Sequence, residues 1–331
     1  MNIYDIAKLA GVSIATVSRV VNDSPKVSEK TKAKVRAVME ENNYTPNVFA
    51  RGLGLNSMKT VGIVCPAVSA TYMAGCVAYL EKRLRSYGYD CILYCSGYEH
   101  EDKEAAVGLI LQKRIDALVL VGSHYAGEKG EDICYVKDAA KEVPVFLING
   151  YIRSNGVYCV LSDNYQAMYE AVSALREAGR EKILFLYDSC SYSGAEKLRG
   201  YEEALKDNGL TVSARYEIFT QNKIQEVKRL LEEQEDLEFD AVVATDDGMA
   251  VGALKYVREK GRSVPEDVEI IGFNDSELAI CCEPELTTID SQNAALCKTA
   301  IDSMMALLQG QTVRHKKVLP CRLVKRGTTS F

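Results

Sequence analysis

The chain of 331 residues is 47% hydrophobic and 26% charged, the composition of a globular protein with two or three domains. No apolar run approaches the roughly 20 residues that span a bilayer, and the first residues lack the basic and apolar parts of a secretion signal. These features argue against a membrane or exported protein and predict a cytoplasmic location.

Charge is unevenly distributed along the chain. Residues 1–60 contain nine Lys and Arg against five Asp and Glu, a net charge of +4, whereas the remainder carries −10. A basic segment attached to an acidic body predicts that only residues 1–60 meet a polyanion such as nucleic acid.

Cysteine and histidine give no sign of a metal or cofactor site. The eleven cysteines lie mostly in apolar runs, as Cys91, Cys95 and Cys159 do, and none forms a CxxC pair. The three histidines are scattered. We therefore expect free thiols in the core, no metal and no cofactor.

Residues 1–60 show no strand pattern, and three short helices are predicted within them. Asn2 and Asp5 form a variant of the capping box at the start of the first helix, and Gly11 ends it. Ser13 and Ser28 are placed to cap the second helix and a third one over residues 29–42.

The spacing of Ala7, Gly11 and Val17 is that of a helix-turn-helix: a small residue at the helix crossing, a glycine in the turn and a valine that packs back. A plain helical hairpin is the alternative. The second helix should bury Val17, Val20 and Val21. The residues expected on its outward face are Ile14, Ala15, Ser18, Arg19 and Asn22.

That outward face carries no acidic side chain to repel phosphate. Arg19 can donate two hydrogen bonds to guanine, and Ile14 or Ala15 can contact a thymine methyl group in the major groove. The residues expected to contact the DNA backbone, which fix the register without reading sequence, are Tyr4, Thr16, Ser18, Asn22, Lys30, Lys32 and Lys34.

Residues 60–331 alternate short apolar runs with amphipathic stretches. Strands are predicted at 61–65, 91–95, 117–121 and 145–148, and a second set at 183–187, 241–244 and 268–271, with helices such as 195–208 and 248–260 between them. Strands that are apolar throughout indicate parallel sheets covered on both faces, so two α/β lobes are expected. A ligand would then lie beyond the carboxyl ends of the strands, in the cleft between the lobes.

Several ordered motifs resemble the lac repressor/galactose repressor family of bacterial transcription regulators, over almost the whole chain. The matching segments are 5–22, 27–31, 43–47, 163–165, 246–252, 272–275, 286–289 and 323–326. The resemblance implies an all-α helix-turn-helix head (1–46), a hinge (47–59) and a two-lobed, periplasmic-binding-protein-like body (60–331). It also implies a homodimer that binds a palindromic operator in double-stranded DNA and senses a small molecule.

The resemblance assigns a role to the hinge, where Gly52 and Gly54 flank Leu53. Glycine in a helix costs roughly 1 kcal/mol relative to alanine, so this segment should not fold alone. In the family it becomes helical on DNA, and the leucine at the position of Leu53 wedges into the minor groove. Relatives usually carry a better helix former at Gly52. With Ser13 and Asn47, Leu53 completes the expected DNA-binding set.

Effector residues are carried over by position. Tyr72 and Met73 follow the first strand, Asn149 follows the fourth, and Lys197 is expected to start a helix. Asp246 and Asn274 end strands of the second lobe. Relatives place an arginine where Lys197 stands. Lysine lacks the planar guanidinium group that pairs with both oxygens of a carboxylate, so a carboxylate ligand bound in this way is less favourable. The remaining polar groups suit sugar hydroxyls.

Two other protein classes compete with a regulator. An enzyme is disfavoured because no GxGxxG after a strand, phosphate loop, GxSxG or HExxH occurs, and because the adjacent Asp246 and Asp247 should diverge. A transport-type sugar receptor would need export. Both leave residues 1–56 unexplained.

No heptad run follows residues 323–326, which predicts a dimer rather than a tetramer. The sequence leaves open whether the small molecule weakens or strengthens DNA binding. It also leaves open whether a partner protein supplies the signal instead.

Overall fold

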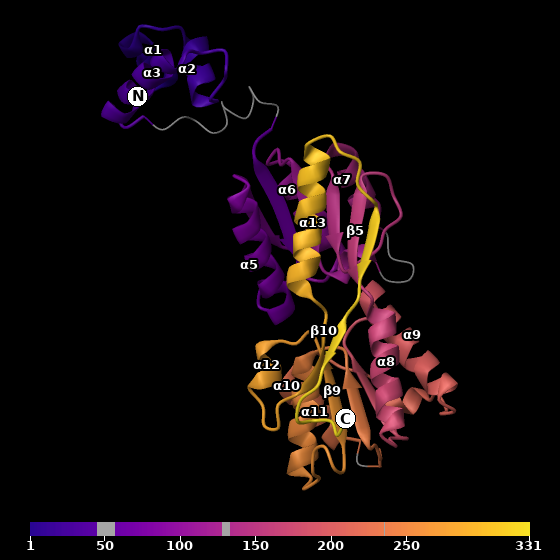
Figure 1. Cartoon of the computed structure of the whole chain (residues 1–331). Helices are drawn as coiled ribbons and strands as arrows, with labels where there is room; N and C mark the ends of the chain where they lie inside the picture. Colours follow the sequence, from indigo (N-terminus) through magenta and orange to yellow (C-terminus); the bar gives the residue numbers. More distant parts are fainter. Residues whose placement is uncertain (45–56, 128–132, 235) are drawn as a thin grey trace.

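The computed structural model describes residues 1–44, 57–127, 133–234 and 236–331 (Figure 1). Its amino-terminal head consists of three helices: α1 (Ile3–Ala10), α2 (Ile14–Val21) and α3 (Glu29–Glu41). All the predicted caps are present. Asn2 and Asp5 form a capping box, Gly11 has the left-handed φ of 60°, and the Ser13 and Ser28 side chains accept hydrogen bonds from backbone N–H groups three residues on.

A small apolar core holds the three head helices together. Ala7 lies where α1 meets α2, and Val17 and Val20 pack back from α2 onto α1 and α3. Val35 of α3 completes the core, whereas Val21 is only half-buried. The helix-turn-helix prediction is thereby confirmed at the level of packing.

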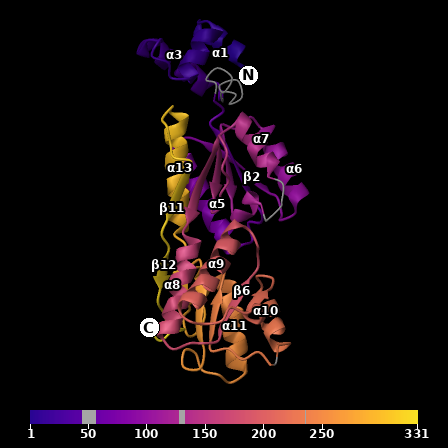
Figure 2. The ribbon, with the colours of Figure 1, turned by 90° about the vertical axis from the view of Figure 1, so that its right-hand side faces the viewer.

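The first lobe of the body is built on a six-stranded parallel sheet of order β11-β5-β4-β3-β1-β2. Its strands are β1 (Thr60–Cys65), β2 (Asp90–Cys95), β3 (Ala117–Val121), β4 (Val145–Ile148), β5 (Val157–Ser162) and β11 (Lys316–Leu319). Helices α5 (Thr71–Ser86) and α13 (Asn293–Leu308) cover one face, while α6 (His100–Leu111) and α7 (Cys134–Glu142) cover the other, as Figure 2 shows. A short 3-10 helix, η1 (Ser123–Ala126), follows β3.

The second lobe repeats this plan with sheet order β12-β10-β9-β8-β6-β7, in which the β10–β12 pair is antiparallel and the other described pairs are parallel. Its strands are β6 (Ile183–Tyr187), β7 (Glu217–Phe219), β8 (Ala241–Ala244), β9 (Glu269–Phe273), β10 (Thr287–Asp290) and β12 (Arg322–Val324). Its helices are α8 (Asn164–Glu177) and α9 (Tyr192–Asp207) on one face, and α10 (Ile224–Glu232), α11 (Asp247–Glu259) and α12 (Glu277–Ile280) on the other. The short 3-10 helix η2 (Ala214–Tyr216) precedes β7.

All seven predicted strands are present, but the division between the lobes is not a simple cut in the sequence. The chain passes between them three times: after β5, after β10, and between β11 and β12 (Figure 1). Helix α13 and strand β11 therefore return to the first lobe. Within the described ranges, no helix is both long and apolar enough to cross a membrane.

All eleven cysteines have free thiols, as expected, but the expected core position is wrong for four of them. Cys65, Cys76, Cys159 and Cys297 are buried thiols, as expected. Cys95 is exposed at the carboxyl end of β2, an edge strand in which no residue is fully buried. The other exposed members are Cys134, Cys190 and Cys281. No group of three or more potential ligand side chains capable of holding a metal occurs in the described ranges.

Candidate DNA-binding surface and ligand cleft

The second head helix presents the outward face that the sequence predicts. Ile14 is 41% exposed although it is a large aliphatic residue, and Ala15 and Arg19 beside it are also exposed. Ser18 and Asn22 are half-buried at the edge of this face. A solvent-exposed isoleucine beside an arginine on a short helix is suited to contact with base edges rather than with the core.

Polar groups that could contact phosphate lie around this face. Ser13 caps α2, and its hydroxyl lies 2.9 Å from the Thr16 hydroxyl, so both groups are held at the helix amino terminus, where anions are favoured. Tyr4 on α1 is 66% exposed, and Lys30 on α3 is exposed.

The expectation that Lys32 contacts the DNA backbone is wrong. Its side chain is buried within the head, and its ammonium pairs with Asp23 at 3.1 Å and Glu29 at 2.8 Å. The hydrogen bond from Lys32 lowers the pKa of Asp23, and the partnership with Glu29 and Asp23 raises the pKa of Lys32. Lys32 therefore ties α3 to the preceding loop and is not available to phosphate.

Asn47 and Leu53 lie outside the described residues.

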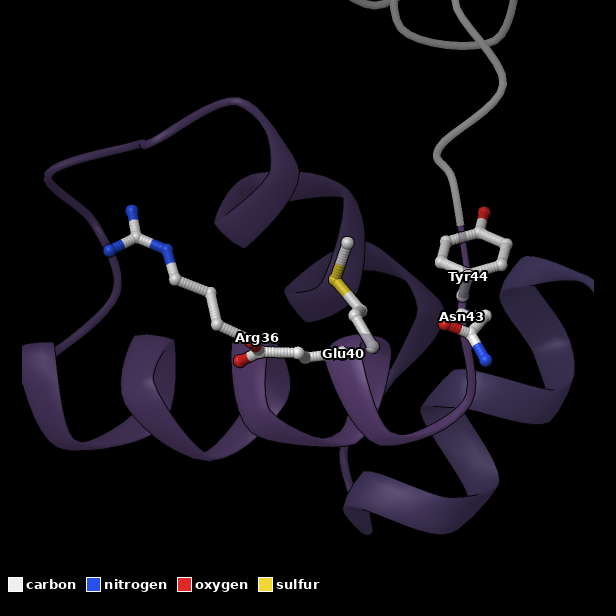
Figure 3. A pocket seen from close by; sticks show the side chains of 5 residues that line it. Arg36, Glu40, Asn43 and Tyr44 are labelled. Carbon is white, nitrogen blue, oxygen red and sulfur yellow. The ribbon is translucent and has the colours of Figure 1, made fainter.

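On the head near the carboxyl end of α3, an open hollow is lined by Arg36, Met39, Glu40, Asn43 and Tyr44 (Figure 3). The labelled side chains spread apart rather than converge, and Arg36 is already paired with Asp23 at 2.8 Å. This hollow offers no convergent polar groups, so we do not treat it as a ligand site.

A second concavity lies between the two lobes of the body. Its inner part is a cavity of about 110 Å³, and it continues into a wider groove of about 1210 Å³. The inner cavity is lined by residues after strand ends in both sheets, where the open-sheet rule places ligands. All six residues predicted to bind the effector line it: Tyr72, Met73, Asn149, Lys197, Asp246 and Asn274.

The amide and carboxylate groups of this cavity are held in fixed orientations. The Asn149 side chain is buried, and its oxygen accepts hydrogen bonds from the Ser162 backbone N–H at 3.3 Å and from Asn164 at 3.0 Å. Asp246 caps α11 through the Gly248 N–H at 2.9 Å and accepts a hydrogen bond from the Asn274 amide at 2.9 Å. Both Asn149 and Asn274 have positive φ, which turns the chain at the strand ends.

Lys197 lines the cavity, but its predicted place at the start of a helix is wrong. Helix α9 already begins at Tyr192, so Lys197 lies well inside it. The ammonium donates to the Thr245 carbonyl at 2.9 Å and lies 3.5 Å from the centre of the Phe273 ring. Burial lowers its pKa to about 8, an effect opposed by the nearby carboxylates of Asp188 and Asp246.

Several lining residues were not predicted. Asp188 follows β6 directly, so the strand-end rule that selected Asp246 would also have selected it. The Asp188 side chain is accessible from the cleft, but the surrounding protein removes much of the water from its carboxylate. This desolvation, together with the negative charge of Asp246, raises the pKa of Asp188. The other unpredicted polar lining residues are Tyr98, Ser123, His124, Ser189, Ser191, Ser193, Asn222 and Thr245.

Hydrogen bonds join the two lobes across this cavity. The hydroxyl of Ser123, after β3 of the first lobe, lies 2.8 Å from the Ser191 hydroxyl and 2.8 Å from the Ser193 hydroxyl of the second lobe. Ser123 and Ser191 are buried. Separation of the lobes would therefore break a small buried network of three hydroxyl groups.

The adjacent carboxylates of Asp246 and Asp247 diverge, as expected. Asp247 is fully buried behind the cavity and accepts hydrogen bonds from the Ser276 N–H at 2.7 Å, the Ser276 hydroxyl at 2.8 Å and the Thr288 hydroxyl. Burial raises its pKa to about 6 in spite of these donors. The pair is therefore not arranged as an acid and base acting on one substrate atom.

Comparisons with known proteins cover both parts of the chain. A family model described as bacterial regulatory proteins, lacI family, matches residues 2–47, and a model described as a periplasmic binding protein-like domain matches residues 172–329. Among solved structures, the lac repressor dimer bound to operator and the anti-inducer ONPF is similar with a TM-score of 0.88 at 28% identity over 99% of both chains. The CelR–cellobiose complex is similar with a TM-score of 0.72 at 26% identity, also over 99% of both.

Curated relatives extend over the full length as well. An HTH-type transcriptional regulator of Lachnoclostridium phytofermentans is 48% identical over 100% of both chains. Catabolite control protein A of Priestia megaterium is 32% identical over 99% of both. These relatives are regulators of transcription rather than enzymes. The chain belongs to the lacI family of bacterial regulatory proteins and is a DNA-binding transcription regulator.

Proposed function

We propose that the protein is a repressor that binds a palindromic operator as a homodimer in the cytoplasm, under the control of a carbohydrate or carbohydrate derivative bound between its lobes. The observation that carries this proposal is the exposed face of α2, where Ile14, Ala15 and Arg19 project from a packed helix-turn-helix.

The chemistry of that face supports readout in the major groove. Arg19 makes no ion pair among the described residues, so its guanidinium is available to a guanine edge, while Ile14 and Ala15 suit thymine methyl groups. Tyr4, Ser13, Thr16 and Lys30, with half-buried Ser18 and Asn22, are proposed to hold the head against phosphate.

A dimer on a palindrome is the arrangement that fits a single short recognition helix. The similar lac repressor structure is a dimer bound to operator. Two heads, each reading one half-site, double the contact area and mirror the two-fold symmetry of the site. We propose that Asn47 contacts the DNA backbone and that Leu53 wedges into the minor groove between the half-sites.

The cleft supports control by a hydroxyl-rich ligand. Carboxylate, amide and hydroxyl groups converge there from both lobes, and CelR, a similar protein, was solved with cellobiose. A ligand that binds one lobe arrangement more tightly than another shifts the equilibrium between them. By linkage, it changes DNA affinity by the same coupling free energy.

The test is equilibrium binding of the full chain to a palindromic duplex and to a random one at increasing salt. Affinity for both should fall linearly on a double-logarithmic plot, with the palindrome bound more tightly throughout. Leu53→Ala should weaken palindrome binding at least tenfold and leave a dimer in sedimentation at micromolar concentration. Equal affinity of the wild type for both duplexes, or unchanged affinity of the variant, would contradict the corresponding part of the proposal.

A further inference from the structure

The inner cavity between the lobes contains more carboxylate than ammonium. Its charged lining residues are Asp188 and Asp246, with Lys197 as the counter-charge. Further out, the wider groove adds one acid and two bases, Glu99, Lys103 and Lys223. A ligand that reaches the inner cavity therefore meets two carboxylates and one ammonium at close range.

The ammonium of Lys197 is largely engaged by the protein. It donates to the Thr245 carbonyl at 2.9 Å and contacts the face of Phe273 at 3.5 Å, both within the second lobe. These contacts compensate a cation that burial disfavours. The nearby carboxylates of Asp188 and Asp246 already balance its single positive charge, so little of that charge is left to neutralise an additional anion.

The two carboxylates differ in how many further hydrogen bonds they can accept. Both oxygens of Asp246 already accept hydrogen bonds at 2.9 Å, one from the Gly248 N–H and one from the Asn274 amide. Asp188, in contrast, accepts a hydrogen bond from the Thr245 hydroxyl at 3.4 Å, beyond the usual range for such a bond, and it is exposed to the cavity. A carboxylate with about four acceptor positions and one long bond has capacity for ligand donors.

We infer, on the basis of the function proposed above, that Asp188 determines effector specificity: it selects a carbohydrate that presents hydroxyl or ammonium donors and rejects phosphorylated or carboxylated ones. A phosphate group carries about −1.5 to −2 charges at neutral pH and would lie beside two carboxylates in a partly desolvated space. An ammonium or hydroxyl group there would instead satisfy the open acceptors of Asp188.

The test uses matched sugars and the full chain. Thermal shift and isothermal calorimetry are measured with glucose, glucosamine and glucose 6-phosphate, the corresponding galactose series, and cellobiose. Neutral or amino members should stabilise the wild type, and the 6-phosphates should not. Asp188→Asn keeps the side-chain shape and should weaken the best amino ligand at least tenfold relative to its neutral counterpart. Asp188→Ala should weaken both.

Glu104→Gln is the control for the change in net charge, because Glu104 is an exposed acid on α6 that does not line the cavity. It should leave every affinity unchanged. Circular dichroism shows whether each variant is folded.

Three results would overturn the inference: a 6-phosphate that binds the wild type more tightly than its neutral form, an amino ligand insensitive to Asp188→Asn, or a panel in which no neutral or amino member binds. DNA binding is measured separately. Failure to prefer a palindrome would overturn the proposed function, whereas preference for a palindrome combined with phosphate-selective ligand binding would overturn only this inference.

Discussion

At the scale of single residues, the basic side chains of the head differ in whether they are available to DNA. Arg19 and Lys32 are both basic and lie near each other in sequence, yet Arg19 is exposed on α2 and Lys32 is buried in ion pairs with Asp23 and Glu29. Charge alone therefore does not identify a DNA contact. Exposure and the presence of an internal partner distinguish the two roles.

Arg19→Ala should weaken binding to the preferred site by about tenfold to a hundredfold, because a bidentate arginine–guanine contact contributes roughly 1–3 kcal/mol. It should also relax sequence preference at one position in each half-site. Lys30→Ala is the matched comparison and should weaken all duplexes alike, with a shallower salt dependence. Competition assays with single-base variants of the site check both. An unchanged preference in Arg19→Ala would refute the assigned role.

Asp247 should give the stability of the body a specific pH dependence. Burial raises its pKa to about 6 from 3.8, so the folded protein binds more protons than the unfolded chain between these values. The contribution of this group is then fully present below about pH 4 and is lost as pH rises through 6. Relative to Asp247→Asn, the wild type should lose about 2–3 kcal/mol of unfolding free energy between pH 4 and 7.

Urea denaturation of both proteins across this pH range measures that difference, and any constant cost of the substitution cancels. A difference that is flat with pH, or that grows in favour of the wild type as pH rises, would show that folding does not raise the pKa of Asp247.

The candidate residues show what the sequence makes predictable at this scale. Tyr72, Asn149 and Asp246 were found because each follows an apolar strand or lies just beyond one, and the structure brings them together. Asp188 satisfies the same strand-end rule because it directly follows β6, so the sequence makes it as predictable as Asp246. The hydroxyl network of Ser123 could not be predicted, because it depends on how closely the two lobes approach.

At the scale of helices and strands, local signals explain most elements. The capping residues and the left-handed Gly11 define the head helices, and apolar runs define seven of the twelve strands found in the described ranges. Strands β11 and β12 were missed because their sequences, KKVL and RLV, are short and partly polar. Their pairing is decided by partners far away in the sequence, such as Cys159 for Lys316 and Ile289 for Leu323.

Close packing of α8 against α9 requires a glycine at position 200. A methyl group there would overlap the carbonyl oxygen of Tyr165 on α8, so Gly200→Ala should destabilise the protein by about 1–3 kcal/mol. Gly108 on α6 is the control, because a methyl group there would meet no atom within 4 Å. Gly108→Ala should be neutral or stabilising by up to about 1 kcal/mol. Thermal denaturation distinguishes the two, and equal effects would refute the packing argument.

At the scale of the whole molecule, the triple crossing between the lobes and the three hydroxyl groups across the cavity have complementary effects. The three segments that connect the lobes limit how the lobes move. The contacts of Ser123 with Ser191 and Ser193 stabilise the arrangement seen here. If the lobes also adopt a second arrangement, as the proposed ligand control requires, these contacts must break when the lobes move apart.

Ser123→Ala should shift the lobes toward a more open arrangement. It leaves the Ser191 and Ser193 hydroxyls without their shared partner, at a cost of about 1–3 kcal/mol to the arrangement seen here. Ser96→Ala is the control, because it removes a buried hydroxyl bond of 2.7 Å to Tyr125 within the first lobe. Small-angle X-ray scattering should show expansion in Ser123→Ala alone. Expansion in both variants, or in neither, would show that the hydrogen bonds of Ser123 with Ser191 and Ser193 do not hold the lobes together.

Two heads are proposed to read a symmetric duplex through Ile14, Ala15 and Arg19. Selection of bound duplexes from a random pool by the full-length protein, followed by sequencing, tests this readout. The wild type should enrich a palindrome with two half-sites, and Arg19→Ala should lose preference at one symmetric pair of positions. A bound pool as random as the input, at moderate ionic strength and with or without candidate sugars, would contradict the account.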